Sequence, residues 1–371
     1  MARSPRVSTP RRTSPRYKST SPEPGPIRRW LKAALFAAAV ALPLAVLHKA
    51  AVPISPPPRS FDQLLAVGDS PEIDRARSEG EGFDPEDEQI RLESVLKEAA
   101  MEDKTVILTT LNEAWASPNS VLDIFIESFR IGEGTRNLLD HLVMVALDKK
   151  AYDRCISVHP YCFSLVTEGV DFSGEKVFMT DGYLKMMWRR IDFLRVVLEM
   201  GYNFIFTDTD IMWFRNPMPH FYPDGDFQIA CDHFLGNNEL DLANEPNGGF
   251  NYVKSNNRTI EFYKFWHLSR DYHPGLHDQD VLNIIKHDPF TKDLGIQMRF
   301  LRTDYFGGIC EPSKDFNEVC TMHANCCIGL SSKIHDLGVM LDDWRRFMSM
   351  PPSVKKSRQH QWRVPQSCSP P

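Results

Sequence analysis

The strongest constraint on the fold lies between residues 183 and 210, where a helical pattern leads into an apolar run that ends in two acids. Gly201 separates the two patterns and is a typical helix stop. Residues 202–206 then form a short, mainly apolar run, which is typical of a buried strand. The apolar residues before the glycine share one helical face: Tyr183, Met186, Met187, Ile191, Leu194, Val197 and Leu198. This order predicts an amphipathic helix that leads directly into a strand.

The same alternation extends upstream. Apolar runs at 105–110 and 141–147 predict strands, and residues 162–166 are expected to be extended. Helical spacing at 119–131 and 148–157 predicts helices between them. Because alternating strands and helices favour a parallel sheet, we predict an α/β domain over residues 101–350, with a mostly parallel sheet flanked by helices. Ligands of such sheets bind at the carboxyl ends of the strands.

The N-terminal region has a different composition. Residues 1–29 contain eight basic residues and one acidic residue, although the whole chain of 371 residues has a net charge of −6. Residues 30–48 follow as an apolar segment. Because a membrane span needs about 20 apolar residues and a basic flank stays in the cytosol, we predict a cytosolic tail at 1–29 and a transmembrane signal anchor at 30–48. An organelle transit peptide is the alternative, since the tail is rich in Arg and Ser.

The segments on either side of the domain are polar and contain several prolines. Residues 49–100 are expected to form a stem in which a helix starts near Pro85, and residues 351–371 a loose tail. A pI of about 6.1 argues against a general nucleic-acid-binding protein. The sequence lacks GxGxxG, GxxxxGK[ST], GxSxG and HExxH patterns, so the nucleotide-loop, hydrolase and zinc-protease sites that carry them are not assigned.

Two acids, Asp208 and Asp210, follow the run at 202–206. Residues two apart on a strand point to the same side, and two adjacent carboxylates repel unless a cation lies between them. Oxygen ligands at a strand end suit Mg²⁺ or Mn²⁺, which keep coordination positions open for phosphate. The alternative is that both aspartates simply mark the exit from a strand.

Two further motifs carry polar groups suited to ligand binding. The paired glycines Gly248 and Gly249 allow positive φ and close approach of the backbone to a ligand, or else form an ordinary turn between two strands. The segment 277–283 has the pattern of a first helical turn, in which Asp278, Gln279 and Asp280 offer acceptors for sugar hydroxyls. N-capping of that helix is the alternative for the two acids.

The C-terminal third contains Cys320, His323 and Cys326 at a spacing that allows zinc binding with Cys310 as a fourth ligand. In an oxidising compartment disulfides are favoured over zinc thiolates. The chain has eight cysteines, and Cys155–Cys162 and Cys310–Cys320 are plausible local pairs. One glycosylation sequon begins at Asn257, which would be modified only in a lumen.

Four stretches together resemble the plant nucleotide-diphospho-sugar transferase domain: GYNFIFTDTDIMWFRNP, NGGFNYVKSN, HDQDVLN and MHANCCIGL. The resemblance covers about 101–350 and is with a family of retaining glycosyltransferases that includes rhamnogalacturonan-II xylosyltransferases and extensin arabinosyltransferases. It implies a GT-A-like, Rossmann-type fold, a Golgi membrane location with type II topology, and a nucleotide-sugar donor held through a divalent metal.

The resemblance also implies roles for single residues. Asp208, Asp210 and His323 match metal-binding positions, and Asp208 is also placed near the ribose. Gly248 and Gly249 match the turn beside the donor sugar, whereas Asp278, Gln279 and Asp280 are the candidates for catalysis at the sugar. The residues expected to lie near the nucleotide base and ribose follow the first strand: Thr109, Thr110 and Asn112. Arg189 or Arg190 is expected to approach the diphosphate from the long helix, and the alternative is that they pair with acids at the edge of the core.

These features predict a membrane-anchored, Mn²⁺- or Mg²⁺-dependent glycosyltransferase. Its partners would be a nucleotide-sugar donor, such as a UDP-pentose or UDP-galactose, and a cell-wall polysaccharide or glycoprotein acceptor. A metal-dependent phosphohydrolase that uses the same acids to activate water is one alternative. A non-catalytic scaffold with the same fold is another, although the positions implied by the resemblance are all filled.

Overall fold

The computed structural model describes residues 85–165, 167, 169–356 and 360–368, and these belong to one compact unit. The predicted cytosolic tail, signal anchor and residues 49–84 of the predicted stem lie outside the described residues. Among the helices of the described residues, none is both long enough and apolar enough to cross a membrane.

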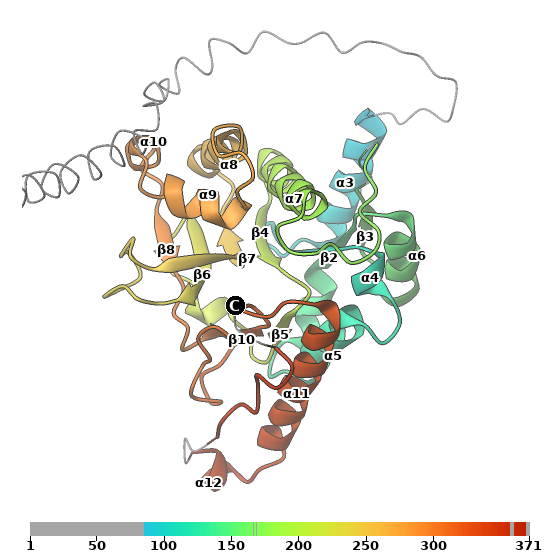
Figure 1. Cartoon of the computed structure of the whole chain (residues 1–371), viewed down its shortest axis with the longest axis vertical. Coiled ribbons are helices and arrows are strands. Elements are labelled where there is room, and N and C mark those ends of the chain that lie inside the picture. Colours follow the sequence, from blue (N-terminus) through green and yellow to red (C-terminus); the bar gives the residue numbers. More distant parts are fainter. Residues whose placement is uncertain (1–84, 166, 168, 357–359, 369–371) are drawn as a thin grey trace, which may run out of the picture. The chain divides into compact units, whose positions relative to one another are not determined.

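A seven-stranded sheet in the order β3-β2-β1-β4-β7-β6-β8 forms the centre of the domain (Figure 1). Six strands run parallel to one another, and only β7 runs against its two neighbours. The strands are β1 (Thr105–Leu111), β2 (Leu142–Ala146), β3 (Cys162–Ser164), β4 (Asn203–Thr207), β6 (Phe227–His233), β7 (Glu245–Val253) and β8 (Met298–Phe300). The prediction of a mixed α/β fold with a mostly parallel sheet is therefore confirmed.

A smaller sheet, β5-β10-β9, adjoins the main one and consists of β5 (Ile211–Trp213), β9 (Phe306–Gly308) and β10 (Thr321–His323). In this sheet β10 pairs antiparallel with β5, which begins one residue after Asp210. The pairing places His323 opposite Ile211. A residue from the last third of the sequence is thereby brought beside the two aspartates.

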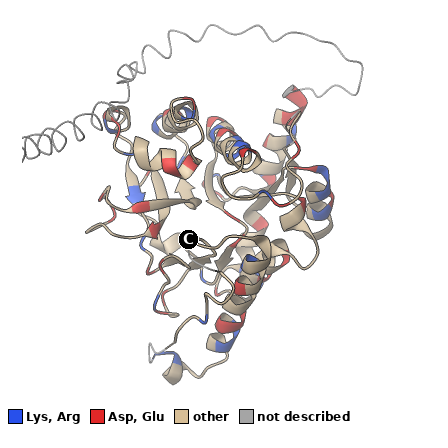
Figure 2. Cartoon of the chain, in the orientation of Figure 1, with Lys and Arg blue, Asp and Glu red and all other residues tan. Residues whose placement is uncertain are grey.

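Helices cover both faces of the main sheet. The remaining elements are α3 (Pro85–Ala99), α4 (Glu113–Ala116), α5 (Val121–Ile131), η1 (Arg136–His141), α6 (Lys149–Val158), α7 (Asp181–Glu199), η2 (Met218–His220), α8 (Asn257–Ser269), α9 (Asp278–Ile285), α10 (Pro289–Asp293), α11 (Leu330–Met348) and α12 (Pro352–Lys355). On α7 and α11, basic residues are interspersed with acidic ones (Figure 2).

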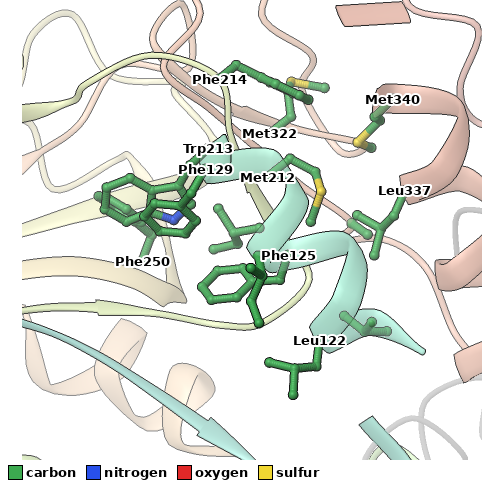
Figure 3. Packing of buried hydrophobic residues seen from close by; sticks show 14 of the residues in the cluster. Leu122, Phe125, Phe129, Met212, Trp213, Phe214, Phe250, Met322, Leu337 and Met340 are labelled. Carbon is green, nitrogen blue, oxygen red and sulfur yellow. The ribbon is translucent and has the colours of Figure 1, made fainter. Parts of the chain in front are cut away.

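The alternation of side chains along β1 shows how the sheet separates two cores. Val106 and Leu108 pack into a core with α3, α7, α8 and α9, whereas Ile107 and Leu111 pack into a second core with α5, α6 and α11. In the second core, Phe129 of α5 stacks on Trp213, with ring centroids 4.6 Å apart (Figure 3). Successive residues of a strand point to opposite faces, so both faces of β1 are apolar because both are covered.

Two segments that were expected to lie outside the domain are packed against it. Leu92 and Leu96 of α3 are buried in the core, so the helix that starts at Pro85 belongs to the folded unit rather than to a stem. The segment expected to be a loose tail is also fixed: the Asp336 carboxylate accepts the backbone N–H groups of Gln366, Ser367 and Cys368 at 2.9–3.0 Å. Polar composition did not predict this packing, because it averages over the single residues that are buried, such as Leu92 and Leu96.

Three disulfides are present among the described residues. Cys155–Cys162 matches the predicted pair. The predicted Cys310–Cys320 pair is wrong, because Cys310 is bonded to Cys326 and Cys320 is free and buried. The third bond joins Cys327 to Cys368. A zinc site built from Cys310 and Cys326 is excluded, since a disulfide sulfur has no thiolate to offer a metal.

Candidate functional site

A cavity of about 470 Å³ lies at the edge of the main sheet where β1, β4 and β6 end. Its wall also includes the beginning of β7, the first turn of α9 and the segment that joins β10 to α11. Because β7 is antiparallel to its neighbours, its N-terminal residues lie beside the carboxyl ends of the other strands. The cavity is therefore at the position where ligands of open α/β sheets bind.

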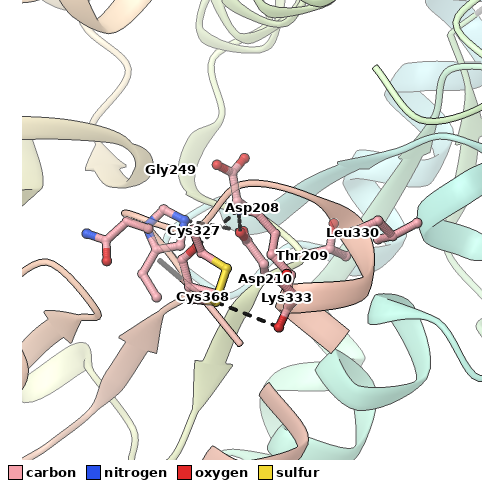
Figure 4. Close-up of polar contacts among 12 residues, drawn as sticks. Asp208, Thr209, Asp210, Gly249, Cys327, Leu330, Lys333 and Cys368 are labelled. Atoms are coloured by element: carbon pink, nitrogen blue, oxygen red, sulfur yellow. Dashed lines mark hydrogen bonds and ion pairs between the residues drawn. A yellow bond between two sulfur atoms is a disulfide. The ribbon is translucent and has the colours of Figure 1, made fainter. Parts of the chain in front are cut away.

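Asp208, Asp210 and His323 meet in this cavity, and each offers a ligand atom within 4.8 Å of the others. The backbone fixes all three: Asp208 N–H donates to the Gly249 carbonyl at 2.7 Å, and Ala324 N–H donates to the Asp210 carbonyl at 3.0 Å. Figure 4 shows Asp208 and Asp210 together with Lys333, and also draws the disulfide between Cys327 and Cys368.

Asp210 is buried and lies next to Lys333 and His323. Its Oδ2 accepts a hydrogen bond from Lys333 Nζ at 2.5 Å, and the same ammonium donates to the Ala324 carbonyl at 3.0 Å. Burial acts to raise the pKa of Asp210, but Lys333 and His323 outweigh it and hold the pKa well below its ordinary value. Oδ1 lies 3.2 Å from His323 Nε2, and no hydrogen bond satisfies it.

This donor set fits a divalent cation. Two carboxylates and an imidazole nitrogen are ligands used by Mn²⁺ and Mg²⁺ sites, and a buried carboxylate oxygen without a hydrogen-bond partner is a group that a cation would satisfy. The residues present are thus those that would hold the metal implied by the resemblance.

Arg190 of α7 connects the cavity to a buried ion pair. Its guanidinium donates to Asp208 Oδ1 at 3.0 Å and to Asp278 Oδ2 at 2.7 Å. Burial raises the pKa of Asp208, against the charge of Arg190. Of the two arginines considered from the sequence, Arg190 is the one that lines the cavity, whereas Arg189 pairs with Asp192 at 3.1 Å.

Asp278 itself is fully buried and does not line the cavity. His277 Nε2 lies 2.7 Å from its Oδ1, and its carbonyl accepts a hydrogen bond from the Trp266 indole at 2.8 Å. Burial opposes ionisation of Asp278, but His277 and Arg190 hold its pKa well below the ordinary value. The position of Asp278 suits a role in holding Arg190, rather than direct contact with a substrate.

The other two residues of the DQD motif do line the cavity. Gln279 Oε1 accepts the Gly248 N–H at 3.0 Å, and Asp280 is exposed at the rim. Asp280 also lies at the N3 position of the capping box of α9, where its Oδ2 accepts the His277 N–H at 3.4 Å. Capping and cavity lining are therefore compatible at this position.

Gly248 and Gly249 lie within β7 and not in a turn, and neither has positive φ. The reason for Gly249 is space: a Cβ there would lie 2.6 Å from His323 Cε1 and 2.7 Å from Asp208 Oδ2. At Gly248 the nearest atom would be Arg190 Nη2 at 3.4 Å. Both the predicted positive φ and the alternative of an ordinary turn are wrong, whereas the close approach is found between the backbone and two metal-site residues.

The residues expected near the nucleotide divide into two groups. Thr110 and Asn112 line the cavity, whereas Thr109 is buried in the strand and lies outside its lining. Asn112 also has a structural role: its amide donates to the carbonyls of Phe172 and Gly174 at 3.0 and 2.8 Å.

Two residues of the cavity were missed in the sequence. Lys333 lies in the first turn of α11, and nothing in its local pattern distinguishes it from a surface lysine. Asp232 lies in β6 and lines the cavity. The signal for Asp232 was present, since it follows an apolar run just as Asp208 follows the run before it.

Comparison with known proteins now identifies the family. The model of the nucleotide-diphospho-sugar transferase family matches residues 137–337. An uncharacterized protein of Arabidopsis thaliana is 51% identical over 282 residues, which are 75% of this chain and 73% of that protein.

Two shorter matches are to proteins with named activities. A UDP-galactose:fucoside alpha-3-galactosyltransferase of Dictyostelium discoideum is 39% identical over 71 residues, which are 18% of this chain and 10% of that protein. The beta-arabinofuranosyltransferase RAY1 of Arabidopsis thaliana is 32% identical over 66 residues, or 17% of this chain and 12% of that protein. The family match spans more than half of the chain, from η1 to α11, and includes both aspartates and His323. The chain therefore belongs to the nucleotide-diphospho-sugar transferase family and is a glycosyltransferase.

Proposed function

We propose that this glycosyltransferase has a GT-A-like fold and uses a UDP-sugar and a divalent metal, Mn²⁺ or Mg²⁺, to glycosylate a cell-wall polysaccharide or glycoprotein, with retention of configuration. The single observation that carries the metal part of the proposal is the convergence of Asp208, Asp210 and His323 in one cavity. The matches to a galactosyltransferase and an arabinofuranosyltransferase support galactose and a pentose as the first donor sugars to test.

The chemistry asked of this site is the stabilisation of a leaving diphosphate. When bound, a divalent cation offsets the negative charge that develops on the diphosphate as the sugar–phosphate bond breaks. The chain also supplies two cationic side chains of its own to this cavity. Arg190 contacts Asp208, and Lys333 contacts Asp210. Preorganised charges of this kind stabilise the transition state without reorganisation.

The test is a panel of donors with the purified domain from residue 86 onward. Binding and release of UDP are measured for UDP-galactose, UDP-arabinose and UDP-xylose, each with Mn²⁺, with Mg²⁺ and with a chelator. We expect at least one donor to bind only when metal is present. If no donor binds under any condition, the proposal is wrong; metal-dependent hydrolysis of unrelated phosphoesters would favour a phosphohydrolase instead.

We also propose a single-pass type II arrangement in the Golgi membrane, with the signal anchor at residues 30–48 and the catalytic domain in the lumen. The three disulfides of the described domain support this, because disulfides persist in oxidising compartments. The exposed Asn257 provides a test. A glycosidase-sensitive mass shift that disappears in Asn257→Gln is expected if the domain is luminal; protease digestion of the domain in intact vesicles would contradict it.

A further inference from the structure

The amides of three separate sequence motifs meet at one carboxylate that none of those motifs contains. Asp232 accepts hydrogen bonds from Asn247 Nδ2, Gln279 Nε2 and Asn325 Nδ2, each at 2.8 Å. The three donors come from β7, the first turn of α9 and the segment after β10. Asp232 and all three amides line the cavity.

Each of these amides is oriented by a second hydrogen bond. The carbonyl oxygens of Asn247, Gln279 and Asn325 accept backbone N–H groups of Gly249, Gly248 and Cys310 at 2.8, 3.0 and 3.1 Å. An amide whose oxygen accepts a backbone N–H must turn its NH₂ group the other way. The three NH₂ groups are thus directed at Asp232, and the carboxylate is held in one orientation.

The count of acceptor positions on Asp232 leaves one available. An ionised carboxylate offers about four lone-pair positions, two on each oxygen. Oδ1 uses both of its positions, for Asn247 and Asn325, whereas Oδ2 uses one, for Gln279. The sulfur of Cys310 lies 3.5 Å from Oδ1, but it is in a disulfide and has no proton to donate. The remaining position on Oδ2 can accept a hydrogen bond from a ligand.

The donor sugar is the ligand that this position suits. The diphosphate is negatively charged and would be repelled by Asp232, whereas sugar hydroxyls are neutral donors for which a carboxylate is a strong acceptor. Gln279 donates to Asp232 and accepts the Gly248 N–H, so it connects Asp232 to β7. The next residue of β7, Gly249, lies beside the metal-site residue Asp208. Of the two acids of the DQD motif, Asp278 is buried outside the cavity lining, and Asp280 lies at the exposed rim.

We infer that Asp232 binds one hydroxyl of the transferred monosaccharide and so selects the donor sugar. The inference rests on the proposed use of a UDP-sugar. It gives the three amides a shared role in holding the specificity residue in place. It also defines the substrate class as sugars with a hydroxyl at the position that faces Oδ2, because a site built to accept a hydroxyl strongly disfavours an analogue that lacks it.

The experiment compares the parent with Asp232→Asn, using UDP alone, the best UDP-sugar of the panel and its monodeoxy analogues. The parent should bind one deoxy analogue at least about 10-fold more weakly than the full sugar, since a hydrogen bond to a charged group is worth that much. Asp232→Asn should lose this discrimination at that one hydroxyl while binding UDP and Mn²⁺ within about threefold of the parent. Glu239→Gln, a matched change in the β6–β7 connection outside the cavity lining, should keep the parent pattern.

Several outcomes separate the two proposals. If the parent binds no UDP-sugar, the proposed function fails. If the parent binds one and Asp232→Asn keeps the discrimination at every hydroxyl, only the role of Asp232 is overturned. Should Asp232→Asn lower the thermal midpoint sharply, Asp232→Glu keeps the charge and moves the oxygen. A shift in which deoxy analogue is disfavoured supports the role, and an unchanged pattern contradicts it.

Discussion

Asp210 and Asp232 reach the same cavity from the two strands that flank β7, and their partners differ. Asp210 is held by two basic side chains, with Lys333 Nζ at 2.5 Å and His323 Nε2 at 3.2 Å. Asp232 is held by three neutral amides at 2.8 Å. The charge of a carboxylate paired with a lysine is offset by the ammonium. A carboxylate held by amides is oriented by neutral donors, which fix its direction. The cavity thus has one side suited to charge stabilisation and another suited to recognition.

Arg190 joins the metal-site aspartates to a buried ion pair, because its guanidinium donates to both Asp208 and Asp278. Its side chain is 3% exposed and that of Asp278 is fully buried. Removing it would leave the buried Asp278 carboxylate without its arginine partner, while His277 Nε2 would remain 2.7 Å from Oδ1.

The largest expected effect is that of Arg190→Met. Breaking a buried pair by removing one partner costs about 3–5 kcal/mol, so the free energy of unfolding should fall by that amount in urea denaturation. The matched control is Arg195→Met on the same helix, whose pairs with Asp192 and Glu199 are partly exposed and should cost about 0–1 kcal/mol. Equal losses in the two variants would show that Asp278 does not depend on Arg190.

Asp210→Asn should affect the charge-stabilising side alone. Substitution of a residue that hydrogen-bonds to a metal ligand typically lowers metal affinity or activity by about 10–100-fold. Loss of a ligand itself should therefore lower the rate of sugar transfer by more than about 100-fold. Titration with Mn²⁺ should show the same loss, whereas discrimination between deoxy sugars that still bind should persist. A variant with normal Mn²⁺ affinity would remove Asp210 from the metal site.

A smaller effect is expected from Gly249→Ala, with Gly248→Ala as its matched control. The added methyl at Gly249 would displace His323 and Asp208, whereas at Gly248 it would meet Arg190 and Asp278 at ordinary contact distances. Overpacking costs about 1–3 kcal/mol, so Gly249→Ala should lower the unfolding free energy within that range and weaken Mn²⁺ binding. If Gly248→Ala weakens metal binding equally, the effect comes from the strand and not from the displaced ligands.

The sequence predicted the position of Asp208 and Asp210, which depends on one strand, better than the surroundings of Asp232, which several elements form together. Asp208 and Asp210 follow a buried strand directly, so their location at its carboxyl end required only the local pattern. Asp232 also follows an apolar run, but its partners Asn247, Gln279 and Asn325 are brought to it only by the packing of β7, α9 and the segment after β10. Those contacts span from 15 to 93 residues of sequence.

Composition was least informative at the chain ends. The segment at 360–368 looks like a tail because it is polar and contains proline. It is held by the Cys327–Cys368 disulfide and by backbone donors to one buried carboxylate, that of Asp336. Neither interaction leaves a periodic pattern. The paired glycines were also assigned wrongly from the sequence. Glycine is favoured both in a turn with positive φ and in a strand that has no space for a side chain, so its presence does not distinguish the two.

The smallest expected effect concerns His277, which lies between Asp278 and the Tyr183 ring. Burial lowers the pKa of His277, but the adjacent Asp278 outweighs it, and the net pKa lies above the ordinary value of 6.5. A raised pKa in the folded state means that the charged imidazole stabilises the fold fully below the unfolded pKa, and that this stabilisation is lost as the pH rises through the folded pKa. The lowered pKa of Asp278 acts in the other direction, because its contribution is lost as the pH falls.

His277→Gln keeps a hydrogen-bond donor and removes the charge. Its unfolding free energy should therefore fall below that of the parent by more at about pH 5.5 than at about pH 9, with a difference under about 3 kcal/mol for a bond to a charged group. A difference in unfolding free energy that stays constant across this pH range would show that His277 supports Asp278 as a neutral donor. Asp278 would then resemble Asp232, which neutral amides hold, and not Asp210.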